Sequence, residues 1–296
     1  MKATYFRNLV SSQQYTLLEK NRKIIESVER TTYDYGTTDS HKLDVYAPIL
    51  SSVPETQPAS KPPIFLFFYG GGFTRGARIN PSQELVHANF GAFFALKGIL
   101  TAIADYRLVP SVSSPGGSED VRDALAWISL SLCDIGDISR LFVMGHSAGG
   151  VHLSGYMLNP SIYNQSIRIS GIILLGVPYE IPVGNKAVSD FRSAAKLYYG
   201  DAKKVAANQP LGMLRRANKD WVVALPPLRN MMAAREPRYL ASAVRTFGQL
   251  YASKGGTVQT NVLDGHDHLS PIGSLCTGEG EEWGIEVAEW ILSNLS

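Results

Sequence analysis

The segment Gly145-His146-Ser147-Ala148-Gly149-Gly150 decides the fold of this chain. It matches the pattern Gly-x-Ser-x-Gly, and its flanks fit, because an apolar run at 141–144 predicts a strand and the small residues of 148–158 predict a helix. A serine on a sharp turn between strand and helix needs an unusual backbone conformation, and glycines two residues away avoid collisions with neighbouring elements. The segment therefore predicts that Ser147 presents its hydroxyl as a nucleophile.

On both sides of this segment, short apolar runs alternate with longer helical patterns, which is typical of a mostly parallel sheet flanked by helices. We expect strands at residues 31–35, 42–47, 64–69, 99–106, 141–144, 169–177, 228–234 and 257–263. Helical patterns cover residues 5–29, 82–97, 148–158, 238–253 and 281–295, and a further helix begins at Ser118. The sequence thus predicts an α/β fold with about eight strands.

The regular alternation lapses between Pro178 and Val222. We interpret residues 178–222 as a small cap inserted into a single domain over residues 1–296, since α/β folds of this length commonly form one domain. The aromatic residues of this stretch include Tyr198, Tyr199 and Trp221. They are compatible with a surface for an apolar or aromatic substrate and equally with internal packing, and the sequence leaves both interpretations open.

Composition argues against several kinds of partner. The formal net charge is +2 and the basic residues are scattered, so we expect no binding of nucleic acid. Apolar runs such as 64–69 are far shorter than the roughly 18 residues that cross a bilayer.

Cys133 and Cys276 fit neither a disulfide framework nor a metal-binding spacing. The first 20 residues lack the apolar stretch of a secretory signal, so we expect a cytoplasmic protein.

A serine nucleophile needs a histidine base, and the base needs a carboxylate to orient it. In hydrolases with this nucleophile turn the three follow in the order serine, acid, histidine. His152 lies on the helix that begins at the nucleophile, from where it cannot easily reach back to the hydroxyl. The base is therefore His266 or His268, which share a loop after the last predicted strand, and their spacing does not choose between them.

Location favours Glu236 as the acid. It follows the predicted strand 228–234 and precedes Pro237, at the sheet edge from which the serine turn also emerges. Five other carboxylates lie between Ser147 and the histidines, at Glu180, Asp190, Asp201, Asp220 and Asp264. Asp264 and Asp267 compete with Glu236 because they are near the histidines in sequence, but neighbours along one loop tend to point apart.

A serine hydrolase also needs amide donors for the oxyanion that develops on the substrate carbonyl. The amide after the nucleophile belongs to Ala148, and the run Gly70-Gly71-Gly72 directly follows the predicted strand 64–69. This run lacks the lysine of a P-loop and the spacing of a dinucleotide-binding turn. We therefore expect an oxyanion hole here and not a nucleotide site.

Taken together, these segments resemble the α/β-hydrolases of the hormone-sensitive-lipase and kynurenine-formamidase-like esterase group. The resemblance runs from about Thr32 to the end and is carried by Tyr69-Gly70-Gly71-Gly72-Phe73, Tyr106-Arg107-Leu108-Val109-Pro110, the Ser147 turn, Arg235-Glu236-Pro237 and Gly265-His266-Asp267-His268. It implies an α/β-hydrolase fold and a triad of Ser147, Glu236 and His268, with His268 in place of His266 as base. It also implies oxyanion donors at Gly71, Gly72 and Ala148.

Two positions depart from the pattern of this group. Tyr69 stands where the oxyanion motif usually begins with histidine, and Glu236 stands where aspartate is more common. Neither change removes a required chemical group.

The resemblance implies a carboxylic ester hydrolase that works through an acyl-enzyme without a metal or organic cofactor, and the aromatic residues of the predicted cap suggest a small apolar or aromatic substrate. An amidase or formamidase, a biosynthetic thioesterase, lactonase or cyclase, and a non-catalytic binding protein are the alternatives. The sequence also leaves open whether the protein forms a homodimer.

Overall fold

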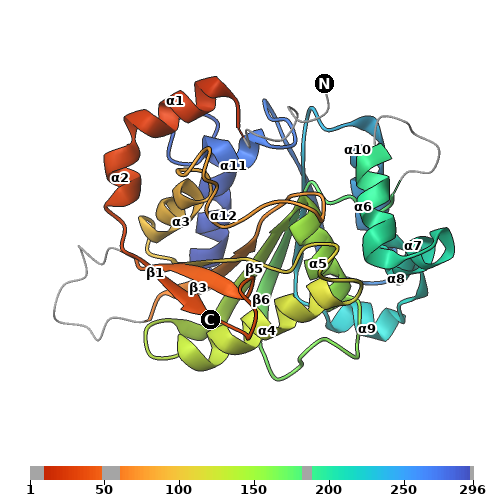
Figure 1. The fold of residues 1–296 in the computed structure, drawn as a ribbon. Coiled ribbons are helices and arrows are strands. Elements are labelled where there is room, and N and C mark those ends of the chain that lie inside the picture. The colour runs from red at the N-terminus through yellow and green to blue at the C-terminus, as the bar shows by residue number, and fades with distance from the viewer. Residues whose placement is uncertain (1–9, 49–60, 182–188, 294–296) are drawn as a thin grey trace.

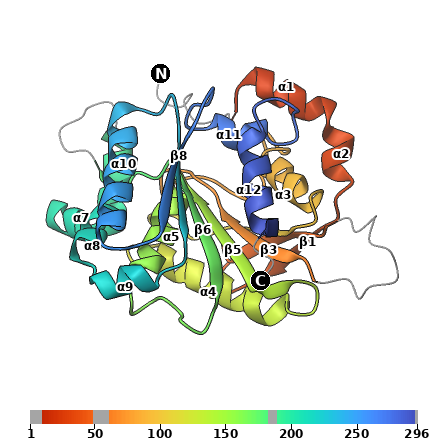
Figure 2. The same cartoon turned by 180° about the vertical axis from the view of Figure 1, so that it is seen from behind.

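The computed structural model describes residues 10–48, 61–181 and 189–293, and these contain one eight-stranded sheet (Figures 1 and 2). The strands lie in the order β1-β2-β4-β3-β5-β6-β7-β8. Pairing is antiparallel between β1 and β2 and between β2 and β4, and parallel in all other pairs. The strands are β1 (Arg30–Asp34), β2 (Lys42–Tyr46), β3 (Pro63–Phe68), β4 (Leu100–Ala104), β5 (Asp137–His146), β6 (Ile169–Leu175), β7 (Leu228–Ala233) and β8 (Val258–Leu263). The predicted mostly parallel sheet is confirmed.

Parallel pairing brings the carboxyl ends of the central strands to one edge of the sheet. Phe68 at the end of β3 pairs with Ala104 of β4 and with Gly145 of β5, and Gly145 pairs with Leu174 of β6. The segments that follow these strands therefore leave the sheet at the same edge, where α/β proteins commonly place their sites.

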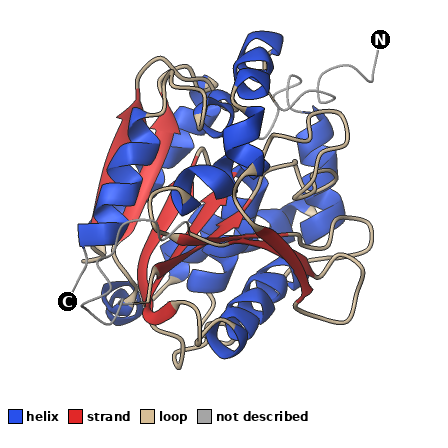
Figure 3. Ribbon diagram, turned by 90° about the vertical axis from the view of Figure 1, so that its left-hand side faces the viewer, coloured by secondary structure: helices blue, strands red, loops and turns tan. Residues whose placement is uncertain are grey.

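Helices cover both faces of the sheet (Figure 3). The helices α3 (Ala88–Ala95) and α12 (Glu282–Ser293) lie on one face (Figure 2), while α4 (Gly116–Ser131) and α5 (Ser147–Met157) lie on the other (Figure 1). The α10 helix (Arg238–Ser253) packs against β7 and β8. This arrangement buries β3 and β4 completely, as expected of strands between two helical layers.

Near the N-terminus, the predicted helical segment 5–29 consists of two helices, α1 (Ser12–Lys20) and α2 (Arg22–Glu26), and its first residues lie outside the described part. The α1 helix packs against α11 (Ser270–Ser274), and α2 packs against α3. The predicted helix 82–97 is shorter than expected, because α3 begins only after His87, whose φ is +76°.

The predicted cap consists of short helices between β6 and β7 in the described part of residues 178–222, while residues 182–188 lie outside it. They are α6 (Ser189–Tyr199), α7 (Ala202–Asn208), α8 (Pro210–Arg216) and α9 (Lys219–Ala224). Asp201 and Asn218 accept amide hydrogen bonds at the starts of α7 and α9, which explains why helices form in weakly periodic sequence. Among the described helices, none combines the length and apolar character that a bilayer crossing requires.

Candidate active site

Ser147 lies at the turn where β5 ends and α5 begins, with a φ of +51°. Such a conformation costs about 1–3 kcal/mol in a non-glycine residue. The flanking glycines are required by space, because a Cβ on Gly145 would lie 2.5 Å from the Gly150 Cα and one on Gly149 would lie 2.3 Å from the Phe68 carbonyl oxygen. The structure thus has the strained turn that the sequence predicts.

His268 lies between Ser147 and Glu236. Its Nε2 is 3.0 Å from the Ser147 Oγ, and its Nδ1 is 3.0 and 2.9 Å from the two carboxylate oxygens of Glu236. Because a carboxylate accepts, Nδ1 carries the proton and the Nε2 lone pair faces the serine hydroxyl. The Glu236 side chain is only 1% exposed, whereas the His268 side chain is 26% exposed. The structure therefore brings together the three residues that the resemblance implies.

Gly176, at the end of β6, makes room for this arrangement. Its φ is +58°, and a Cβ there would lie 2.7 Å from Glu236 Oε1 and 3.1 Å from His268 Nδ1. Sequence reasoning missed this residue, although a glycine that closes a predicted central strand was a usable signal. It helps the longer glutamate side chain to fit where aspartate is more common.

The neighbouring loop residues have other contacts. His266 is buried with its Nδ1 3.1 Å from the Ser270 Oγ, and burial lowers its pKa. Asp267 accepts hydrogen bonds from the amides of Leu269 and Ser270, while Asp264 is exposed. These residues shape the loop that carries His268, and none of them contacts Ser147 in the described hydrogen bonds.

His146 is a second residue that sequence reasoning missed. Its Nε2 donates to the backbone oxygen of His268 at 2.9 Å, and burial together with the nearby His268 lowers its pKa to about 3. The imidazole is therefore neutral, and it connects the turn that carries the serine to the loop that carries the histidine. Its place directly before Ser147 was the available signal.

The run Gly70-Gly71-Gly72 after β3, which we call the glycine loop, lies against Ser147, since a Cβ on Gly70 would be 2.9 Å from the Ser147 Cβ. The backbone hydrogen bonds of the described turns and loops include none donated by the amides of Gly71 or Gly72. Ala148 is the second residue of α5, where amides precede the first helical hydrogen bond. Ala148 thus follows Ser147 directly in the chain, and Gly71 and Gly72 follow Gly70, the glycine that approaches the Ser147 side chain.

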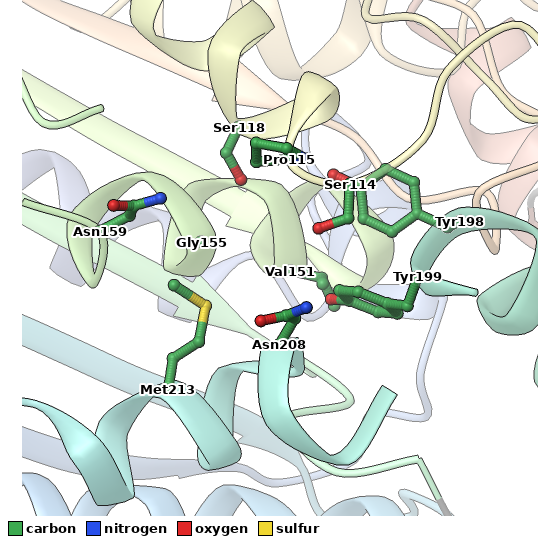
Figure 4. Close-up of a pocket in the computed structure, with 10 residues that line it drawn as sticks. All are labelled: Ser114, Pro115, Ser118, Val151, Gly155, Asn159, Tyr198, Tyr199, Asn208 and Met213. Carbon is green, nitrogen blue, oxygen red and sulfur yellow. The ribbon is translucent and has the colours of Figure 1, made fainter. Parts of the chain in front are cut away.

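A cavity of about 170 Å³ lies between α4, α5 and the cap helices (Figure 4). Its lining carries hydroxyl, amide, aromatic and thioether groups and no charged side chain, from Ser114, Pro115, Ser118, Val151, Gly155, Asn159, Tyr198, Tyr199, Asn208 and Met213. The Tyr198 and Tyr199 rings also pack on Phe73, which follows the glycine loop. Trp221 lies elsewhere, against Tyr163.

The comparisons with known proteins give the family. A family model described as the alpha/beta hydrolase fold matches residues 65–270, so this chain belongs to the α/β-hydrolase fold family. The chain is 28% identical over 176 residues to probable carboxylesterase 13 of Arabidopsis thaliana, and the matched segment covers 53% of this chain and 52% of the relative. It is 25% identical over 180 residues to catharanthine synthase of Catharanthus roseus, covering 54% and 53%. The chain thus spans about half the length of the curated relatives it matches.

Solved structures have the same fold at low sequence identity. Esterase B from Lactobacillus rhamnosis superposes with a TM-score of 0.71 at 16% identity, over 96% of each chain. A fungal esterase from Rhizomucor miehei also gives 0.71, at 19% identity over 99% of this chain and 92% of that one.

Proposed function

We propose that this protein is a serine esterase that hydrolyses carboxylic esters through an acyl-enzyme. The observation that carries the proposal is the continuous line of hydrogen bonds from Glu236 through His268 to the Oγ of Ser147. Relatives whose names describe them as carboxylesterases support the same reaction.

In the proposed mechanism, His268 Nε2 takes the hydroxyl proton as Ser147 Oγ attacks the ester carbonyl. The amides of Gly71, Gly72 and Ala148 stabilise the oxyanion, and His268 then gives the proton to the departing alcohol. Water attacks the acyl-serine with His268 again as base, and the acid product leaves. Glu236 keeps Nδ1 protonated throughout, so that Nε2 is always the atom that faces the serine.

The proposed substrate is a small apolar or aromatic ester. Phe73, Tyr198 and Tyr199 form an aromatic group beside the glycine loop. The nearby cavity has no charged side chain in its lining, so a neutral group would enter it without the desolvation cost of an ion.

A biosynthetic role in which a nucleophile other than water resolves the acyl group is the second candidate. It is favoured by a relative whose name is that of a synthase, namely catharanthine synthase. The same three residues would serve this reaction, and the difference lies in the acceptor that reaches the acyl-serine.

The test is a panel of aryl and alkyl esters, anilides, lactones and thioesters, assayed with the wild type and with Ser147→Ala. We expect ester turnover in the wild type, and a loss of about 10⁴-fold or more in the variant. A fluorophosphonate probe should label the wild type and leave Ser147→Ala unmodified. Ester turnover that survives this substitution would remove the proposal, and turnover of anilides alone would change it to an amidase.

A further inference from the structure

The loop that follows β3 is attached at both of its ends to one carboxylate, that of Asp105. At the start of the loop, the Tyr69 hydroxyl donates to Asp105 Oδ1 at 2.7 Å. At its end, the Arg78 backbone amide donates to the same oxygen at 2.6 Å, and the Arg78 guanidinium pairs with Oδ2. A single side chain at the exit of β4 therefore closes the base of the loop that contains Gly71 and Gly72.

Tyr69 is held firmly in this position. It is 1% exposed, and its ring stacks on those of His87 and Tyr106 with centroids 5.1 Å away in each case. Its backbone oxygen accepts the Tyr106 hydroxyl at 2.8 Å. Burial and the adjacent Asp105 raise the pKa of Tyr69 well above its ordinary value of 10.0, so the hydroxyl remains a donor.

The loop folds back on itself, which couples its ends to its glycines. The Gly71 oxygen accepts the amides of Thr74 and Arg75, and a Cβ on Gly71 would lie 1.8 Å from the Arg75 oxygen. A Cβ on Gly76 would lie 2.6 Å from the Tyr69 ring. With so little space inside the loop, a shift of either end moves the amides of the glycines as well.

The attachment continues into the antiparallel edge of the sheet. The Arg78 Nε is 2.9 Å from Asp44 Oδ1 on β2, and Asp44 also accepts the Thr32 hydroxyl of β1 at 2.6 Å. Arg78 is thus bound by two carboxylates in a largely buried setting, with its side chain 15% exposed and that of Asp44 0% exposed. Charge-assisted bonds of this kind are among the stronger hydrogen bonds in proteins.

We propose that Asp105 is a positioning residue for the loop of residues 69–78 that follows β3. It acts through Tyr69 and Arg78 to hold the glycine amides of this loop against Ser147. The inference rests on the proposed function, in which those amides stabilise the oxyanion. It also gives a role to the tyrosine that replaces the usual histidine, since the phenol reaches the carboxylate at the exit of the neighbouring strand.

Tyr69→Phe is the sharpest test, because it removes one hydroxyl and leaves the stacked ring. Its matched control is Tyr179→Phe, which removes an equally buried hydroxyl that donates to Asn230 Oδ1 at 2.7 Å, away from the loop. We expect Tyr69→Phe to lower kcat about tenfold while KM changes less than about twofold, since ground-state binding does not use the oxyanion donors. Asp105→Asn, which weakens both ends of the loop, should lose on the order of 10²-fold in kcat.

A trifluoromethyl ketone inhibitor separates positioning from general destabilisation, because its serine adduct carries an oxyanion. Its inhibition constant should rise by the same factor by which kcat/KM falls in Tyr69→Phe and Asp105→Asn, and should stay at the wild-type value in Tyr179→Phe. Thermal melts of all variants show whether each one is folded at the assay temperature.

The inference would be overturned if folded Tyr69→Phe and Asp105→Asn kept wild-type kcat and inhibitor affinity, or if Tyr179→Phe lost as much of both. Neither result would touch the proposed function, which depends on the loss of turnover in Ser147→Ala. Conversely, activity in Ser147→Ala would remove the proposed function, and the oxyanion argument with it.

Discussion

At the scale of single residues, two histidines that are two positions apart in the chain have separate environments. The His268 ring bridges Ser147 and Glu236, while the His266 ring is buried against Ser270. Under the proposed mechanism only the first of them moves a proton during turnover, and the second stabilises the loop.

Replacing each histidine by alanine should separate these roles. We expect His268→Ala to lower kcat/KM by about 10⁴-fold or more with little change in melting temperature, because it removes the base from a site that is partly open to solvent. His266→Ala should lower the melting temperature, since it removes a buried side chain, while kcat falls less than about tenfold. Steady-state kinetics and calorimetry on both variants check this, and equal losses of kcat/KM would contradict it.

The second prediction at the residue scale concerns the length of the Glu236 side chain. Glu236→Asp should lower kcat by about 10²-fold, because shortening the side chain moves the carboxylate by on the order of 1 Å from His268 Nδ1. The Arg235 amide donates to the His266 oxygen at 2.9 Å, which keeps the backbone from following. Glu236→Gln, with the original length and no charge, is the companion variant and should be worse still. Wild-type kcat in Glu236→Asp would show that the backbone adapts.

The candidate nucleophile and the candidate acid could be predicted because their signals are local. Glycine spacing points to Ser147, and position after a strand favours Glu236. Spacing could not choose between His266 and His268, since their ring directions depend on how the Asp267 and Ser270 contacts fold the loop. The choice of His268 came from resemblance, and its contacts in the structure agree with it.

At the scale of elements, α5 and β3 approach so closely that the helix begins beside the glycine loop. A Cβ on Gly149 would lie 2.3 Å from the oxygen of Phe68 and 2.4 Å from that of Tyr69, and neither backbone oxygen can rotate away. A Cβ on Gly155, further along the same helix, would lie 2.3 Å from the Ser118 Oγ, which can rotate.

Gly149→Ala and Gly155→Ala should therefore differ, although both are glycine-to-alanine changes in one helix. Helix propensity favours alanine by about 1 kcal/mol at each site, and overpacking costs about 1–3 kcal/mol. We expect Gly149→Ala to be the less stable variant by at least about 1 kcal/mol and to lose activity. Urea unfolding and ester kinetics measure both quantities, and equal stabilities would refute the steric argument.

Elements were predictable where the apolar period was strong, as in the central strands and α10. The segment between β6 and β7 was recognised only as a lapse in that period, because α7 and α9 are short helices whose first turns are capped by Asp201 and Asn218. The late start of α3 was not predictable either, since it follows from the positive φ of His87.

At the scale of the whole molecule, three buried histidines affect the response to acid. Burial lowers the pKa of His146 to about 3 and those of His87 and His152 to about 4, against about 6.5 in an unfolded chain. All three are neutral in the native state and take up protons on unfolding. Their contribution to stability is complete above pH 6.5 and is lost as the pH falls toward 4.

Each of these histidines should contribute at most about 1.4 kcal/mol per pH unit to the slope of the unfolding free energy against pH, between about pH 6 and 4. His152→Leu isolates one of them, because neither ring nitrogen of His152 has a hydrogen-bond partner among the described residues. We expect urea titrations across this range to give a slope lower by about that amount in the variant than in the wild type. Identical slopes would mean that His152 is also neutral in the unfolded chain or charged in the native one.

The shared edge at the carboxyl ends of the strands has a consequence for refolding experiments. Ser147, Glu236 and His268 follow β5, β7 and β8, and their distances are set by how those strands align. A slip of one residue between two strands would shift one group by about 3.3 Å, more than a hydrogen bond tolerates. Under the proposed mechanism, titration with a fluorophosphonate therefore counts correctly aligned molecules, and collapsed chains with displaced strands would not react with it.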